Sequence, residues 1–212
     1  MSTGRDLLQE CRTNLVANGF AVFLARDPAQ AQQIFFETIL PQVRHEQISW
    51  ADSLTMMATG VLDRLLADAH FNLIRTFDPS AGRGEIIERR RQALLADLFL
   101  TGTNAITLCG KLVNLDMIGN RTAAITFGPK KVVLFVGRNK IVADLPSAID
   151  RVRNHAAPLN ARRHNFPTPC ATTGRCHDCN APKRICNAWA ILDKCFPVGR
   201  IKVILIDADL GL

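Results

Sequence analysis

The chain has 212 residues, 48% of them hydrophobic, and a formal net charge of +7. This length and composition suffice to bury a core without disulfide bonds, which argues against a small cystine-stapled module. The opening MSTGRDLLQE lacks a signal-peptide core, and no segment approaches the roughly 18–20 apolar residues of a membrane-spanning helix. We therefore expect a cytoplasmic protein with no membrane span and with its cysteines reduced.

The positive charge is concentrated towards the C-terminus. Beyond residue 150 there are ten Lys and Arg against four Asp and Glu, whereas residues 1–150 hold sixteen against fifteen. Such a basic region can meet nucleic acid, an anionic cofactor or a thiolate-ligated cluster, or it can be a solvated face.

In the first hundred residues the hydrophobic pattern alternates between helix and strand with short links. Strands are expected at 21–25, 47–51 and 71–77, and helices at 6–18, 28–40, 53–70 and 85–100. This alternation predicts a parallel or mixed sheet covered by helices.

The second half predicts a hairpin, then buried strands separated by helices. The hairpin pairs 105–108 with 111–116 around Cys109-Gly110, strands follow at 131–137 and 201–209, and helices at 146–155 and 187–192. We expect residues 1–212 to form a single α/β domain with a central mixed or parallel sheet and a Cys-rich loop at about 165–187.

Two polar, basic turns follow predicted strands. Because backbone N–H groups and basic side chains at strand exits attract anions, the turns 119–121 and 137–140 predict a pocket for a phosphate, carboxylate or nucleotide. The alternative is that the glycines serve turns and the basic side chains are solvated. The candidate ligand residues are Gly119, Asn120, Arg121, Gly137, Asn139 and Lys140.

Four of the seven cysteines lie within one polar segment, PCATTGRCHDCNAPKRIC. A C-x₂-C pair flanked by two outer cysteines can wrap one metal centre, and the uneven spacing favours an iron–sulfur cluster over zinc. Free thiols or a redox disulfide are a third reading. The candidate ligands are Cys170, Cys176, Cys179 and Cys186.

Other polar residues have a simpler interpretation. Asp52 and Asp116 are expected to cap helices or form turns, and the histidines to lie on the surface, with His177 between two of the clustered cysteines as the exception. The remaining cysteines at 11, 109 and 195 are interpreted as small apolar residues, with Cys195 as a reserve ligand.

Several segments together resemble the lactate utilisation domain (LUD) family, in particular its short members with a C-terminal cysteine motif. They include NAIT, GNRTAAITFGPKKVVLFVGRNKIV, AIDRVRNHAAPLNARR, PCATTGRCHDC and GRIKVILIDADLGL. The resemblance implies an α/β fold related to ribose-5-phosphate isomerase and the CoA-transferases. It also implies a link to the oxidation of L-lactate to pyruvate alongside iron–sulfur partner subunits.

The chain departs from its larger relatives in two respects. It lacks tandem ferredoxin motifs, and it has no counterpart of the CoA-transferase glutamate. We therefore expect an accessory or electron-transfer component that binds a small anionic ligand, with a homodimer as one assembly to test. The alternatives are an isomerase- or transferase-like enzyme with a structural zinc, and a nucleic-acid-binding module. The latter is disfavoured because the basic region has few aromatic residues for base stacking.

Overall fold

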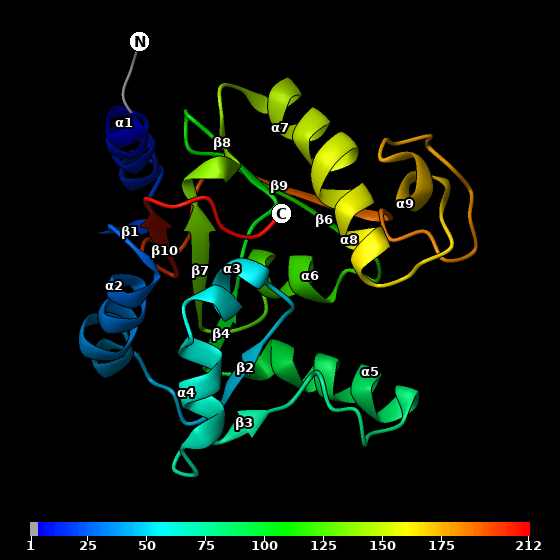
Figure 1. Cartoon of the computed structure of the whole chain (residues 1–212). Coiled ribbons are helices and arrows are strands. Elements are labelled where there is room, and N and C mark those ends of the chain that lie inside the picture. Colours follow the sequence, from blue (N-terminus) through cyan, green and yellow to red (C-terminus); the bar gives the residue numbers. More distant parts are fainter. Residues whose placement is uncertain (1–3) are drawn as a thin grey trace.

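The computed structural model describes residues 4–212, and the side chains of residues 6–212. Its centre is a six-stranded sheet in which every pair of neighbours is parallel, in the order β1-β10-β7-β4-β2-β3 (Figure 1). The strands are β1 Ala21–Ala25, β2 Ile48–Trp50, β3 Leu73–Ile74, β4 Leu98–Thr101, β7 Lys131–Gly137 and β10 Ile201–Ile206.

The sheet is buried on both faces, as its strand β7 shows. Val132 and Leu134 point into one hydrophobic cluster, and Val133 and Phe135 into another, because successive side chains alternate across a strand. The expected α/β class, with a central sheet flanked by helices, is therefore confirmed.

One face is covered by helices from the first third of the chain. They are α2 Pro28–Gln33, which continues as a π-helical segment Ile34–Ile39 and a 3₁₀ turn Leu40–Gln42, α3 Leu54–Ala58 and α4 Val61–Ala67. The single helix expected at 53–70 is interrupted because Gly60 adopts a left-handed conformation with φ of 69°.

The other face carries α1 Gly4–Ala17 and α6 Asn120–Thr126 together with a smaller sheet. That sheet has the order β8-β5-β6-β9, with β8 Ile141–Val142, β5 Ala105–Thr107, β6 Leu112–Asp116 and β9 Ala188–Leu192. The predicted hairpin is confirmed, since Ala105 pairs with Val113 and Ile106 with Leu112 in an antiparallel ladder.

A long helical arm packs on the smaller sheet (Figure 1). It runs through α7 Leu145–Arg151, a π-helical segment Val152–Ala156 and α8 Ala157–Arg163, and the Cys-rich loop with the short α9 Pro169–Thr173 follows. The remaining helix, α5 Arg83–Gln92, ends in a 3₁₀ turn Ala93–Leu95. In the part of the chain that the structure describes, the helices all fall short of the length and apolarity needed to cross a membrane.

Two predicted helices are corrected. Residues 98–100, expected to end a helix, belong to the central strand β4, because Leu98, Phe99 and Leu100 are buried between neighbouring strands. Residues 188–192, also expected to be helical, form strand β9 against β6.

The order of the strands creates a crevice at one edge of the main sheet. From β2 the chain continues outward to β3, whereas from β4 it continues the other way through β7 to β10. Neighbouring strands whose connections diverge leave a gap at their carboxyl ends, and open α/β sheets bind ligands at such positions. The crevice between β2 and β4 is therefore where a site is expected.

Candidate functional site

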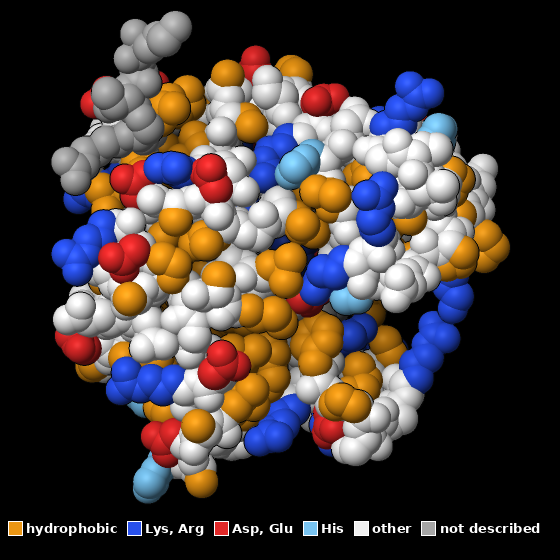
Figure 2. All heavy atoms as spheres, in the orientation of Figure 1, with side chains coloured by type: hydrophobic (Ala, Val, Ile, Leu, Met, Phe, Trp, Pro, Cys, Tyr) orange, Lys and Arg blue, Asp and Glu red, His pale blue; other side chains and the backbone are white. Residues whose placement is uncertain are grey.

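A cleft of about 430 Å³ opens at the carboxyl ends of β2, β4 and β7. Its walls include Asp52 after β2, Gly102 and Asn104 after β4, and Lys140 after β7, and Asn160 of α8 closes it from the opposite side. Lys, Arg and His side chains gather along the rim on the α8 side (Figure 2). The cleft thus occupies the crevice that the strand order predicts.

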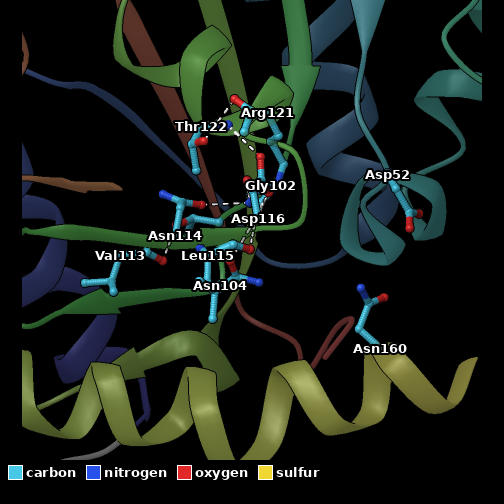
Figure 3. Close-up of polar contacts among 12 residues, drawn as sticks. Asp52, Gly102, Asn104, Val113, Asn114, Leu115, Asp116, Arg121, Thr122 and Asn160 are labelled. Atoms are coloured by element: carbon cyan, nitrogen blue, oxygen red, sulfur yellow. Dashed lines mark hydrogen bonds and ion pairs between the residues drawn. The ribbon is translucent and has the colours of Figure 1, made fainter. Parts of the chain in front are cut away.

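Arg121 lies in the floor of this cleft and is fully engaged by the protein (Figure 3). Its three nitrogens donate five hydrogen bonds of 2.7–3.3 Å, which matches the five N–H groups of a guanidinium. The acceptors are the side chains of Asp116, Asn114 and Asn104 and the carbonyls of Gly102 and Leu115. Arg121 therefore joins β4, β6 and α6 and has no donor left for a ligand.

Only some residues of the two expected anion-binding turns line the cleft. Asn120, Arg121 and Lys140 line the cleft, whereas Gly119, Gly137 and Asn139 are absent from its walls. The Asn139 side-chain oxygen instead accepts a hydrogen bond of 3.2 Å from the backbone N–H of Leu210.

The N-terminus of α6, the other expected anion contact, is also occupied. Asp116 Oδ2 accepts a hydrogen bond of 2.8 Å from the backbone N–H of Thr122. A carboxylate of the protein thus already fills the position that a ligand anion would take.

Lys140 is the unusual cation of the site. Its side chain is only 6% exposed, and in the described part of the chain no hydrogen bond or ion pair reaches its Nζ. Burial, together with the positive charges of Arg151 and Arg121, lowers the pKa of Lys140 to about 7. Near neutral pH this amine is therefore present in both protonation states.

A second cation, Arg90, lines the cleft with spare hydrogen-bonding capacity. Its guanidinium lies over the ring of Phe77 at 5.3 Å, and its buried Nε has no hydrogen-bond partner in the described structure. Burial lowers its pKa, against the opposing effect of Asp116. Arg90 and Lys140 thus line the same cleft as the saturated Arg121–Asp116 pair, and both are cations that could meet a ligand.

The cleft also contains an acid–base group that the sequence did not reveal. Asp52, directly after β2, forms an ion pair with Arg163 and lies 3.0 Å from His164 Nε2 through its Oδ2. The contact links the end of α8 to the main sheet across more than a hundred residues of sequence. Capping is the role of Ser53, whose hydroxyl accepts from the backbone N–H of Met56.

The four clustered cysteines line a single small hollow of about 20 Å³, which we call the cysteine hollow. Its other walls are His177, Arg153, Arg184, Trp189, Leu115 and Ala157. Two guanidinium groups beside four thiols provide the positive surroundings that thiolates require. Cys11, Cys109 and Cys195 lie outside the cysteine hollow. Burial raises the pKa of the Cys11 thiol to about 12.

The sulfurs do not converge on one point. Among the described residues, no three His, Cys, Asp or Glu side chains are arranged to hold a single metal ion. The pKa of Cys186 is raised, mainly by burial, and Cys176 and Cys179 are close enough to add to this effect. The four cysteines therefore line one pocket, but their side chains do not surround a single metal position.

The cysteine hollow and the cleft are adjacent. Leu115 and Ala157 line both, and Ile185, next to Cys186, lines the cleft. The Cys-rich loop therefore forms part of the cleft wall.

Comparison with known proteins agrees with this architecture. A solved structure described as a DUF162 family protein from Deinococcus radiodurans superposes with a TM-score of 0.51 and 15% sequence identity, over 97% of this chain and 99% of that one. At that identity the likeness shows the fold alone. No curated protein matches the chain in sequence. The family model described as LUD domain matches residues 8–206, nearly the whole chain, and the chain therefore belongs to the LUD domain family.

Proposed function

We propose that this protein is an accessory or electron-transfer component of L-lactate oxidation, which binds a small carboxylate in the cleft beside an iron–sulfur cluster held by Cys170, Cys176, Cys179 and Cys186. The observation that carries the proposal is that all four cysteines line one hollow, which shares a wall with a cationic cleft. Iron–sulfur protein subunits are the partners that this role requires.

The donor set of the cysteine hollow fits a cluster. Four cysteine thiols are the ligand set of [2Fe–2S] and [4Fe–4S] centres, and cluster ligands attach to separate irons. The sulfurs of a zinc site, in contrast, all lie about 2.3 Å from one ion. The four thiols can serve either centre, and their uneven spacing in the sequence favours the cluster. When bound, it would supply one-electron transfer.

The polar residues of the cleft support the proposed binding of a carboxylate. Arg90 and Lys140 offer donors to a carboxylate, while Arg121 fixes the floor of the cleft and the Asp52–Arg163 ion pair forms part of its wall. A charged hydrogen bond of this kind contributes about 1.5–3 kcal/mol to binding. These cations suit a carboxylate, and the proposed role in lactate oxidation makes a small 2-hydroxy or 2-oxo acid the ligand to test.

The test is the metal content of protein purified without oxygen. We expect brown protein with iron and acid-labile sulfide, which loses its colour in the Cys176→Ser and Cys179→Ser variants. Cys195→Ser is the matched control and should keep the colour, since Cys195 lies outside the hollow. A colourless protein with one zinc per chain would favour the structural-zinc alternative, and protein with neither metal would contradict both.

A further inference from the structure

We infer that Lys140 is a covalent catalytic residue, which condenses with the carbonyl carbon of a 2-oxo acid bound in the cleft. The inference rests on the proposed function for the ligand class. It goes beyond that function by assigning a nucleophile and a bond-forming step.

The first argument is the position of the amine. Lys140 follows the exit of β7 on a 3₁₀ turn, Arg138–Lys140, and its side chain lines the cleft while remaining 6% exposed. A Cβ atom built on Gly211 would lie 3.2 Å from Nζ, so the C-terminal segment covers the amine on one side. The amine is therefore held at the cleft with few alternative positions.

The second argument is the charge around it. The charged groups that act on Lys140 are Arg151 from α7 and Arg121 from α6, and both are positive. Neither can move aside, because Arg151 donates to the carbonyls of Asn139 and Asn104 at 3.1 and 2.7 Å, and Arg121 is saturated. A buried ammonium between two fixed cations and without an acceptor readily gives up its proton, and this is a known way of activating a lysine nucleophile.

The third argument is the rest of the cleft. A 2-oxo acid needs a cation for its carboxylate, and Arg90, which lines the cleft, offers one. Proton transfer needs a side chain with an atom that the protein does not already engage. Both oxygens of Asp116 are engaged, whereas Asp52 Oδ1 and His164 Nδ1 have no hydrogen-bond partner in the described structure.

The step balances without an oxidant. The neutral amine nitrogen attacks the carbonyl carbon to form a C–N bond, and the carbonyl oxygen leaves as water carrying the two amine hydrogens. The product is an imine, which gains a proton to become an iminium ion. The iminium keeps the positive charge beside the ligand carboxylate, and water reverses the reaction.

Reductive trapping tests the inference. Protein purified without oxygen is incubated with pyruvate, reduced with cyanoborohydride, digested and mapped by mass spectrometry. We expect one adduct per chain, at Lys140, with a yield that rises at least several-fold from pH 6 to pH 8. The Lys140→Arg variant should lose the adduct. The matched control Lys130→Arg should keep it, because Lys130 is exposed and paired with Asp97 outside the cleft.

Wild-type mapping keeps the inference falsifiable even if a Lys140 variant fails to fold. Adducts spread over exposed lysines, with none enriched at Lys140, would overturn it. If pyruvate raises the melting temperature but leaves no adduct at Lys140, condensation is wrong and the carboxylate site stands. If pyruvate neither binds nor forms an adduct, the proposed ligand class fails together with the inference.

Discussion

Arg121 is a structural residue whose loss should be costly at the level of the fold. The Arg121 side chain is 12% exposed and pairs with Asp116, whose side chain is 9% exposed. Removing Arg121 would leave three polar side chains and two backbone carbonyls without their hydrogen-bond donor. We expect Arg121→Ala to lower the free energy of unfolding by about 3–5 kcal/mol, measured in urea. Arg138→Ala, which removes an exposed cation outside the cleft, should cost about 1 kcal/mol or less. Equal losses would contradict this role.

Gly102 allows β4 to pass close to the start of α3. A Cβ there would lie 2.6 Å from Ser53 Oγ, which caps α3 by accepting from the backbone N–H of Met56. We expect Gly102→Ala to cost about 1–2 kcal/mol in urea unfolding, since an N-cap contributes about 1 kcal/mol.

Two controls isolate the cause of that loss. Gly84→Ala, in α5 with nothing within 4 Å of the new Cβ, should stabilise the protein by about 0.5 kcal/mol. In a Ser53→Ala background, Gly102→Ala should add little further cost. A full additional loss there would show that the cap is not the group displaced.

Lys140 should make stability depend on pH. Because its pKa is lowered to about 7 in the folded protein from 10.5, the unfolded chain binds more protons between these values. The free energy of unfolding should therefore rise with pH in this window, by up to about 1.4 kcal/mol per pH unit. Below pH 7 the folded protein bears the full destabilisation from burying the protonated amine. Lys140→Met should be more stable than wild type at pH 6, with the difference shrinking by pH 10. A difference that stays constant would contradict this.

At the scale of elements, the Cys-rich loop depends on few contacts. Of residues 165–187, Thr168 and Ile185 are buried. Much of the internal bonding comes from Arg184, which donates to the carbonyls of Cys179 and Cys186 and to Asp178. A segment with so little core needs another source of order, and metal binding can supply it.

Limited trypsin digestion should report that order. With the metal in place we expect residues 165–187 to resist cleavage, and in chelated protein or Cys176→Ser we expect rapid cuts after Arg175 or Lys183 with the core intact. Equal resistance in both states, at matched reduction, would show that packing alone orders the loop.

Most elements follow from the hydrophobic pattern, and the two failures have physical causes. The strand at 98–101 is apolar at three successive positions, because a strand buried on both faces shows no alternation of polar and apolar residues. It also follows a helical segment closely, so the sequence pattern assigns the apolar run to the end of that helix. In β9 the exposed positions are Trp189 and Ile191, so the polar alternation that marks a surface strand is missing.

The site was harder to predict than the fold. The turns at 119–121 and 137–140 were found because glycines and basic residues follow strand-like runs. The Asp52–Arg163 contact joins residues 111 positions apart, and the saturation of Arg121 depends on acceptors from β4 and β6. Such contacts leave no mark in local sequence, although Asn104 stands in the NAIT segment that marked the family.

At the scale of the whole molecule, ligand binding should stabilise the fold, because the cleft joins both sheets and the helical arm. Pyruvate or lactate at about one hundred times its Kd should add about 2.7 kcal/mol to the free energy of unfolding. For a chain of this size that is roughly 5–10 °C in Tm, measured by thermal shift at constant ionic strength. Arg90→Gln should reduce the shift and Arg138→Gln should not. Equal shifts in both variants would point to a general effect of anions on a protein of charge +7.

The wall shared by the cleft and the cysteine hollow has a thermodynamic consequence. Leu115 and Ala157 touch both spaces, so whatever fills one space fixes side chains that the other must accommodate. If the proposed cluster and carboxylate both bind, the factor by which the cluster changes carboxylate affinity must equal the factor by which the carboxylate changes cluster affinity. The affinity for the carboxylate would then report whether the cluster is present.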